Sequence, residues 1–471
     1  MKRYSRQYID GTWLESTGRS FVEVVNPANE CVIAEVVRGT AEDVDRAVKA
    51  ASYAFDEWSA SSVSDRVEVL NALADVIEKN GDVVTETVVA EIGQPVTWAR
   101  RASTAMTVSD LRNFADALPA IAWEERIGDA TVRRLPVGVV GAITAWNGPI
   151  RSVCLKAGAA IAAGCTVVLK SSEVAPLTPY LLAEFTEDAG LPPGVFNMVT
   201  GTGAEVGEQI ASHPGIDMVS LTGSVRAGSR VMEMASRRVK RLALELGGKS
   251  ANVILPDADL ATAMRTGVQD AFRNSGQVCG ALSRVLVPRD RLDEAEALAA
   301  EVAEAFVIGD PCSPETQLGP LANEDQYRRV RGHIERAIDG GVKLVTGGLD
   351  RPDGLERGFY VRPTVFSGTN DDSIAREEVF GPVLVIIPFD DEEDAIRIAN
   401  DSDFGLAGGV WAQDARHARR VAGRIRTGRV RINGAPIDMR APHGGLKLSG
   451  IGREMGRHGI EDFLEFQSLH G

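Results

Sequence analysis

The chain has 471 residues, which is too long for a single hydrophobic core and predicts two or three domains. Hydrophobic residues make up 44% of it and 48 glycines are present, as in globular proteins with many tight turns. Its formal net charge of −15 argues against nucleic acid or an anionic membrane as the main partner.

Nothing in the sequence predicts a membrane span, a secretion signal or a metal site. No run of about 18 apolar residues occurs, and the basic start Met1–Arg6 is not followed by an apolar signal core. The five cysteines form no CxxC pair and no zinc-like spacing. We therefore expect a reduced, cytoplasmic protein without a metal ion.

The first 40 residues read as short strands and turns, and three helices follow. The first is expected from Thr40, where Asp43 gives an acidic version of the capping box. The second has apolar residues at helical spacing over 67–77 and stops at Gly81. The third is expected over 83–118. All three are interpreted as packing elements without chemistry.

Residues 124–136 are predicted to form a hairpin that turns at Gly128-Asp129. The segment is polar on both sides and interrupts two apolar regions. This pattern is typical of an arm used in oligomerisation, but an ordinary surface hairpin fits the residues as well.

From residue 137 short apolar strands alternate with helices, which indicates βαβ units and a parallel, doubly wound sheet. Ligands bind such sheets at the carboxyl ends of the strands. The expected strands are Val137–Thr144, Thr166–Leu169, Val195–Val199, Met218–Leu221 and Leu242–Leu244.

A second strand and helix alternation begins after about residue 250 and predicts a second α/β unit. The glycine-dense stretch 440–457 is expected to be a loop. The expected strands of this unit are Ala251–Leu255, Arg284–Pro288, Val383–Pro388 and Arg429–Asn433, and its helices lie near 257–273, 290–306, 323–340, 391–399 and 413–425.

Cys279 is the candidate nucleophile. It lies among small and polar residues, where a thiol is accessible, whereas core cysteines normally lie among aliphatic residues and are inert. None of the six histidines shows a local pattern that would make it the base for this thiol, and each is interpreted as a surface or packing residue.

Glu245 and Asn147 are the candidates for activating chemistry at Cys279. Glu245 ends an expected strand among apolar and glycine neighbours, so burial should raise its pKa and make it a base near neutral pH. A structural carboxylate paired with a lysine or arginine is the alternative. Asn147 also follows a strand, where its amide can donate to an oxyanion, or can serve as a turn residue or helix cap.

Three glycine-rich stretches are candidates for phosphate-binding loops. The spacing in 201–207 is one residue too long for the dinucleotide fingerprint, and neither 223–230 nor 243–250 completes a P-loop. An NTPase is therefore rejected. Residues 223–228 still follow a strand and open a helix, so their amides can hold a pyrophosphate.

Taken together, these residues are similar to the aldehyde dehydrogenase superfamily, and the similarity extends along essentially the whole chain. The 34-residue interval from Glu245 to Cys279 fits the same pattern. The motifs that carry the similarity are Thr144-Ala145-Trp146-Asn147, Leu169-Lys170-Ser171-Ser172-Glu173, Leu221-Thr222-Gly223-Ser224, Glu245-Leu246-Gly247-Gly248-Lys249, Gly276-Gln277-Val278-Cys279, Glu378-Val379-Phe380-Gly381-Pro382 and the glycine stretch 444–454.

The resemblance implies two doubly wound α/β domains, a Rossmann-like cofactor domain and a catalytic domain, with a small β arm for oligomerisation. It implies an NAD-binding domain over 1–117 and 137–247, a catalytic domain over 248–447, and an arm made of 118–136 and 462–471. A homodimer or homotetramer without a nucleic acid or membrane partner is expected.

The resemblance also implies a covalent mechanism. Cys279 would attack the aldehyde, Asn147 and the Cys279 amide would hold the oxyanion, and Glu245 would activate the water that hydrolyses the thioester. A coenzyme-A-acylating semialdehyde dehydrogenase, a thiol esterase or hydrolase without redox chemistry, and a catalytically silent binding fold are the alternatives.

For the cofactor, the family pattern implies NAD rather than NADP, because a carboxylate beside the ribose 2′-hydroxyl repels a 2′-phosphate. Lys170 and Glu173 would contact the adenine ribose. The other implied cofactor residues are Trp146, Gly223, Ser224, Glu378 and Phe380.

For the aldehyde, the resemblance implies a tunnel that departs from the usual family pattern. Gly148 and His443 stand where family members often have aromatic residues, and Leu155 stands where several do. A wider, partly polar tunnel predicts a bulky or oxygenated aldehyde. Val278 would also line it, and Arg151 near its mouth is either a contact for a substrate carboxylate or a surface arginine.

Overall fold

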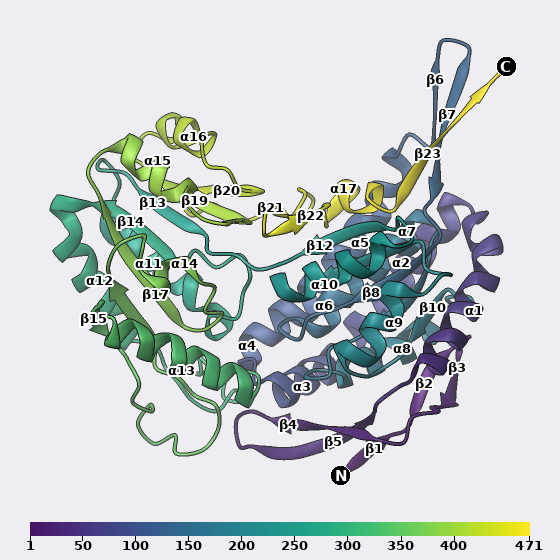
Figure 1. Cartoon of the computed structure of the whole chain (residues 1–471), viewed down its shortest axis with the longest axis horizontal. Helices are drawn as coiled ribbons and strands as arrows, with labels where there is room; N and C mark the ends of the chain where they lie inside the picture. Colours follow the sequence, from purple (N-terminus) through teal and green to yellow (C-terminus); the bar gives the residue numbers. More distant parts are fainter.

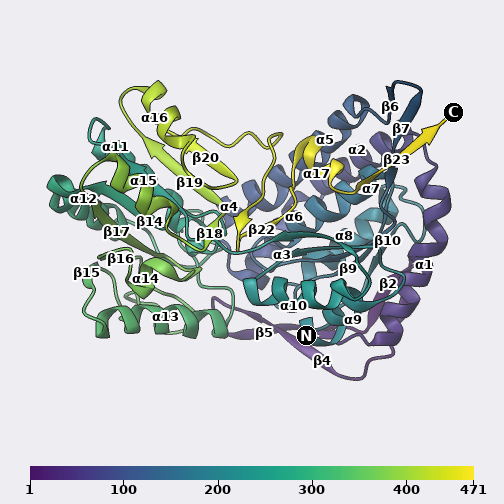
Figure 2. The same ribbon diagram turned by 45° about the horizontal axis from the view of Figure 1, so that its top comes forward.

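A computed structural model describes residues 1–471 and shows two α/β domains side by side, with a long ribbon projecting from one of them (Figures 1 and 2). The chain passes from the first domain to the second directly after one strand of the first sheet. The architecture confirms the predicted fold class of two α/β domains with a β arm. No helix is long and apolar enough to cross a membrane.

The first domain contains an eight-stranded sheet whose five central strands are parallel. Two of them are added on one side of β8 and two on the other, so the strand order reverses at the carboxyl end of β8, which is where ligands bind such sheets. The five are β8 (Val139–Ile143), β9 (Thr166–Lys170), β10 (Phe196–Met198), β11 (Met218–Thr222) and β12 (Arg241–Glu245).

Antiparallel strands complete this sheet on both edges. β2 (Arg6–Ile9) and β3 (Thr12–Glu15) cover one edge. At the other edge β22 (Gly450–Ile451) pairs with β12, which places Gly450 opposite Glu245. Most of 440–457 is loop, as expected, but backbone hydrogen bonds to the edge of β12 order Gly450–Ile451 as a strand.

The N-terminal helices follow the predicted caps, with one exception. Helix α1 (Ala41–Ser59) begins with the capping box of Thr40 and Asp43, and α2 (Val63–Lys79) also has a capping box. The single helix expected over 83–118 is broken into α3 (Gly81–Ile92), α4 (Val96–Ala99), a π-helical turn and α5 (Met106–Ala117). The break occurs because Gly93 adopts a left-handed cap and is closely followed by a proline.

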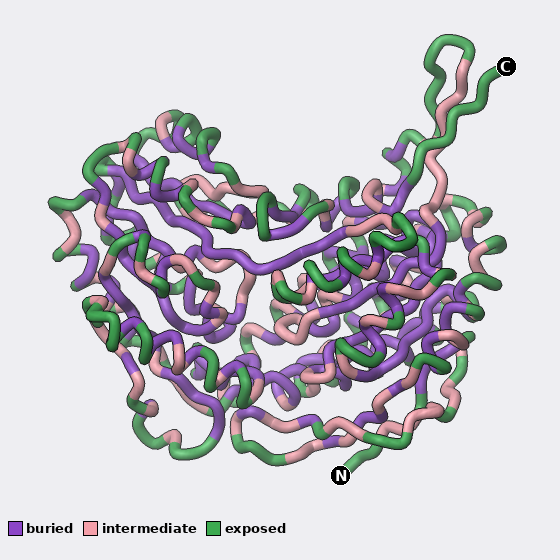
Figure 3. Tube along the Cα trace, in the orientation of Figure 1, coloured by how far each residue is buried: buried purple, intermediate pink, exposed green.

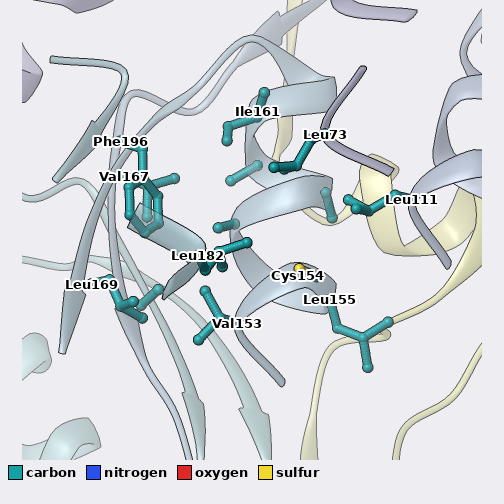
Figure 4. Packing of buried hydrophobic residues seen from close by; sticks show 14 of the residues in the cluster. Leu73, Leu111, Val153, Cys154, Leu155, Ile161, Val167, Leu169, Leu182 and Phe196 are labelled. Carbon is teal, nitrogen blue, oxygen red and sulfur yellow. The ribbon is translucent and has the colours of Figure 1, made fainter. Parts of the chain in front are cut away.

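Buried aliphatic residues pack on both faces of the first sheet. One face is covered by α6 (Pro149–Val153), a π-helical turn and α7 (Ala159–Ala163). Figure 4 shows the packing of this helix against strand residues such as Val167 and Leu169. Leu155 lies at the edge of the cluster, and its side chain points away from the others (Figure 4).

The second domain contains a seven-stranded sheet with six parallel strands. Strands β15 (Lys343–Thr346), β16 (Thr364–Ser367) and β19 (Ala407–Trp411) were not predicted. The first two lie outside the regular alternation of strands and helices, and β19 contains two glycines, which are uncommon in strands. The predicted strands are observed as β13 (Ala251–Ile254), β14 (Arg284–Pro288), β17 (Val383–Phe389) and β20 (Arg429–Ile432).

Helices cover both faces of this second sheet, close to the predicted ranges. They are α11 (Leu260–Phe272), α12 (Leu292–Glu304), α13 (Glu324–Asp339), α15 (Glu392–Asn400) and α16 (Ala415–Ala422).

The projecting ribbon is the predicted hairpin joined by the C-terminal strand. β6 (Glu124–Ile127) and β7 (Ala130–Pro136) form the hairpin, and β23 (Leu464–His470) pairs with β7 along its whole length. Figure 3 shows that most of this ribbon is exposed, far from either core. Its exposed residues include large apolar ones, among them Ile127, Phe466 and Leu469.

Candidate active site

Cys279 lies on a strained turn between α11 and β14. The turn begins where α11 ends, and three successive residues, Asn274, Ser275 and Gly276, adopt left-handed backbone conformations with φ of 53°, 54° and 72°. Such conformations cost non-glycine residues about 1–3 kcal/mol each and are retained where function needs them. A β-carbon on Gly276 would lie 1.9 Å from the carbonyl oxygen of Gly381, so only glycine fits there.

Buried amide side chains hold this turn in place. Asn274 Nδ2 donates to the carbonyl oxygens of Asn147 and Gln277, both at 3.3 Å. Gln94 Nε2 donates to Asn274 Oδ1 at 3.0 Å, and Ser103 Oγ donates to Gln94 Oε1 at 3.0 Å. Gln94 and Asn274 were not among the predicted site residues, because their role arises from contacts between segments about 180 positions apart, which no local pattern shows.

Asn147 links the first domain to the Cys279 turn. It follows β8 at the point where the strand order reverses, and its Nδ2 donates to the carbonyl oxygen of Gln277 at 3.0 Å. The amide carries a second hydrogen that is free to donate. The alternative of a helix cap is wrong, since Gly148 occupies the cap position of α6. Asn147 is therefore held against Gln277, two residues before Cys279, and one N–H of its amide remains free to donate.

Cys279 is half-buried. Its polar neighbours in the sequence predicted a more exposed thiol. Burial raises the pKa of the thiol to about 12, and the nearby guanidinium of Arg429 opposes this rise. The other two internal cysteines, Cys154 and Cys165, are fully buried. Cys279 is thus a protonated thiol at neutral pH in the absence of ligands.

Glu245 ends β12 and is buried with no hydrogen bond to either carboxylate oxygen. Burial raises its pKa well above the ordinary glutamate value, and the charge of Glu454 adds to the rise. The alternative of a structural ion pair is wrong, because the nearby Lys156 Nζ pairs with Glu454 Oε1 at 2.6 Å instead. The predicted base is therefore buried and unpaired.

His443 lies beside Glu245. Its Nε2 is 3.6 Å from Glu245 Oε2, and its Nδ1 is buried without a partner. Burial lowers the pKa of His443 well below the ordinary value, so the imidazole is neutral. His443 is therefore not a surface histidine; it is buried beside Glu245.

The cleft between the domains has the size and charge for a nucleotide. It encloses about 660 Å³ and is lined by Ser224 at the N-terminus of α10 (Val225–Ser236) and by Glu378 from the second domain. Helix N-termini and guanidinium groups both bind phosphate. The arginines that line it were not predicted; they are Arg226, Arg328, Arg329, Arg336 and Arg376.

Lys170 and Glu173 lie together at the carboxyl end of β9. Lys170 Nζ is 2.6 Å from Glu173 Oε2. Burial raises the pKa of Glu173, but the charge and hydrogen bond of Lys170 outweigh burial and hold that pKa below its ordinary value. The pair is charged and can contact a sugar hydroxyl through both members.

Glu378 and two aromatic rings surround the approach to Cys279 from the cleft. The amide of Gly248 donates to Glu378 Oε1 at 3.0 Å, and a β-carbon on Gly247 would lie 2.2 Å from Glu378 Oε2. The rings of Trp146 and Phe380 meet edge to face with centroids 5.3 Å apart. This arrangement places apolar ring surface next to a carboxylate.

The predicted tunnel residues differ in how far they are buried and in what they contact. Gly148 has no atom within 4 Å of an added β-carbon, so this side of the site is open. Val278 is half-buried, whereas Leu155 is buried at the edge of the core. Arg151 is no surface arginine, because its Nε donates to the buried Asp110 at 2.7 Å.

The sequence model described as the aldehyde dehydrogenase family matches residues 13–469. The chain belongs to the aldehyde dehydrogenase family. A 3-succinoylsemialdehyde-pyridine dehydrogenase from Pseudomonas sp. is 47% identical over 475 residues, covering 100% of this chain and 99% of its own. Family membership confirms the predicted enzyme class, an oxidoreductase acting on aldehydes.

Solved structures agree with this assignment. A mutant of aldehyde dehydrogenase C from Pseudomonas syringae, in complex with NAD+ and octanal, is 47% identical and superposes with a TM-score of 0.98 over 99% of this chain and 96% of its own. An aldehyde dehydrogenase from Mycobacterium tuberculosis in complex with NAD+ is 42% identical, with a TM-score of 0.97 over 99% and 98% of the two chains.

Replacing Gly276 by alanine tests whether the strained turn positions Cys279. The added methyl group would strike the carbonyl of Gly381 and displace the turn, so we expect kcat to fall about 100-fold or more. Gly190→Ala is the matched control, because Gly190 has the same φ of 72° but open space around its β-carbon. NADH formation and Tm are measured for both. Equal losses of kcat in the two variants would contradict the role of the turn.

Proposed function

We propose that this enzyme oxidises an aldehyde to its carboxylic acid with NAD, through a covalent intermediate on Cys279. The observation that carries the proposal is that the site contains both a half-buried thiol, Cys279, and a buried carboxylate, Glu245, whose two oxygens have no hydrogen-bond partner in the protein. A carboxylate with a raised pKa and free oxygens is suited to take a proton from water.

The proposed reaction has three steps. Glu245 takes the proton of Cys279 and passes it to solvent, and Sγ bonds to the carbonyl carbon to give a thiohemiacetal, whose oxyanion accepts a hydrogen bond from Asn147. Loss of hydride from that carbon leaves a thioester; bound NAD supplies the hydride acceptor. Glu245 then takes a proton from water as the oxygen attacks the thioester, and the C–S bond breaks to release the acid and regenerate Cys279.

NAD fits the residues of the cleft. The charged pair of Lys170 and Glu173 would bind the adenine ribose, where Glu173 disfavours a 2′-phosphate. Ser224, Gly223 and the unpredicted arginines would hold the pyrophosphate, and Glu378 the nicotinamide ribose. Trp146 and Phe380 would pack beside the nicotinamide. The NAD+ complexes of two relatives support this choice.

A bulky or oxygenated aldehyde is supported by the open side at Gly148 and the polar His443. The relatives do not select one substrate. One protein that is 47% identical is named for 3-succinoylsemialdehyde-pyridine, and another was crystallised with octanal. A coenzyme-A-acylating reaction is disfavoured because Glu245 is present as a free base, and a non-redox hydrolase is disfavoured because the nucleotide cleft is present.

A panel of aldehydes tests this function. We expect NADH to form with NAD, without coenzyme A, with a higher kcat/KM than with NADP, and with a larger aldehyde preferred over acetaldehyde. Cys279→Ala should lose activity by at least about 1,000-fold, while Cys312→Ala, which removes an exposed cysteine, should not. An absolute requirement for coenzyme A, or activity that survives Cys279→Ala, would rule the proposal out.

Glu245 should also give the enzyme a distinctive pH dependence. Folding raises its pKa, so the folded state holds this proton more tightly than the unfolded chain does. The free energy of unfolding therefore does not change with the protonation of Glu245 below the ordinary glutamate pKa. It falls as the pH rises from there toward the pKa of Glu245 in the folded enzyme. The Tm advantage of Glu245→Gln over the native enzyme should grow from pH 4 to neutral pH (a range of about 3 units), measured by scanning calorimetry. A constant Tm difference would contradict the burial of an ionisable Glu245.

The ribbon made of β6, β7 and β23 is proposed as an oligomerisation arm. Its exposed Ile127, Phe466 and Leu469 are large apolar side chains that an isolated ribbon leaves in water. We expect light scattering to show a dimer or tetramer, and Phe466→Glu to shift it toward monomer. Tyr53→Glu, at another exposed apolar residue on α1, is the control. A native monomer at micromolar concentration would contradict the arm's role.

A further inference from the structure

Four arginine side chains gather around the Cys279 turn. Arg429 and Arg431 are two residues apart on β20 and so share one face of that strand. Arg273 lies on the turn itself and Arg151 on α6. The charges of Arg151, Arg273 and Arg431 all act on Arg429 and lower its pKa, as expected for neighbouring guanidinium groups.

These four guanidinium groups share two aspartates. Asp110 pairs with Arg151 at 2.7 Å. Asp270 pairs with Arg431, and it lies 3.6 Å from Arg273. No carboxylate pairs with Arg429. Among these side chains four guanidinium groups therefore face two carboxylates, a local excess of positive charge in a chain whose net charge is −15.

Arg429 is an unusual cation because nothing in the protein balances it. Its Nε is buried without a hydrogen-bond partner, and its side chain forms no ion pair. Burial lowers its pKa, which shows that the charge is poorly solvated. The charge of Arg429 acts on Glu245 and opposes the rise of its pKa, yet both oxygens of Glu245 are unpartnered as well. A half-buried, unpaired guanidinium is costly, and an anionic ligand would offset the cost.

The position of Arg429 places that ligand next to the nucleophile. A β-carbon on Gly280 would lie 2.6 Å from Arg429 Nη2, so the guanidinium lies against the residue that follows Cys279. Arg151 Nη2 and Arg273 Nε are likewise buried without partners. These unmet donors point to a planar anion with two acceptor oxygens, which is the group that a guanidinium fork binds best.

We propose that Arg429 binds a carboxylate carried by the aldehyde substrate, with Arg151 and Arg273 contributing charge. The substrate is then a short semialdehyde, because a carboxylate held beside Gly280 must lie within a few carbon atoms of an aldehyde held at Cys279. This inference rests on the proposed function and narrows its oxygenated aldehyde to an anionic one. In this proposal Arg151 helps to attract the substrate carboxylate, which is one of the two roles predicted for it from the sequence.

The test compares a charged aldehyde with its uncharged counterpart. Initial rates of NADH formation are measured for 4-oxobutanoate and for its methyl ester, with native enzyme, Arg429→Gln and Arg429→Lys. Arg424→Gln is the matched control, since Arg424 is an exposed arginine of the same domain, paired with Glu393. Binding of succinate to native enzyme and to Arg429→Gln is followed by calorimetry, which does not depend on turnover.

We expect native kcat/KM to favour 4-oxobutanoate over the ester by about 10- to 100-fold, the range for a charge-assisted contact. Arg429→Gln should remove this preference through KM and abolish succinate binding, Arg429→Lys should restore part of it, and Arg424→Gln should change nothing. High salt should raise KM for 4-oxobutanoate alone.

Two results would overturn the inference while leaving the proposed function intact. One is oxidation of the ester at least as efficiently as 4-oxobutanoate by the native enzyme. The other is an equal fall in kcat for both substrates in Arg429→Gln, which would mean that Arg429 acts on the Cys279 thiolate and not on the substrate. No NADH from any aldehyde would instead refute the proposed function, and the inference with it.

Discussion

The site depends on one constraint, a carboxylate that is buried and has no partner. Glu245 is fixed at the end of β12, whose edge is covered by β22 with Gly450 opposite it. The cation that would naturally neutralise it, Lys156, is engaged by Glu454. Glu245 therefore retains a raised pKa and two free acceptor oxygens, and this combination is what a water-activating base requires.

The rest of the site is assembled across the boundary between the two domains. The first domain supplies Glu245 and Asn147 from the ends of its strands, and the second supplies Cys279 from a strained turn. Hydrogen bonds from Asn147 to Gln277 and from Asn274 to Asn147 join the two sides at the turn that carries the nucleophile. The nucleotide cleft lies along the same boundary and is lined by residues of both domains, such as Ser224 and Glu378.

The sequence was sufficient for the features that are local. Strand and helix alternation revealed both sheets, and Glu245, Asn147 and Cys279 stood out because each ends a strand or lies in a polar turn. The break in the helix expected over 83–118 could have been predicted from Gly93, whereas β16 lies outside the regular alternation of strands and helices. The contact of Gln94 with Asn274 joins residues that only the folded chain brings together.

Burial was the property that sequence could least predict. The polar neighbours of Cys279 suggested an exposed thiol, yet the turn folds inward and raises its pKa. Arg429 is not among the predicted site residues, because an arginine on a short strand is usually exposed, whereas here it lies against Gly280 with no carboxylate to balance it. Whether a buried charge has a partner depends on residues that are distant in the sequence. In this site the unpaired charge of Arg429 is what indicates an anionic substrate.

The most direct test of the account is to trap the acyl group on the enzyme. Glu245→Gln is mixed with butanal and NAD, quenched within one turnover, digested and analysed by mass spectrometry. The account predicts one NADH per subunit and a butanoyl group on the peptide that contains Cys279. Full turnover by Glu245→Gln, or a butanoyl group found only on the exposed Cys31 or Cys312, would contradict it.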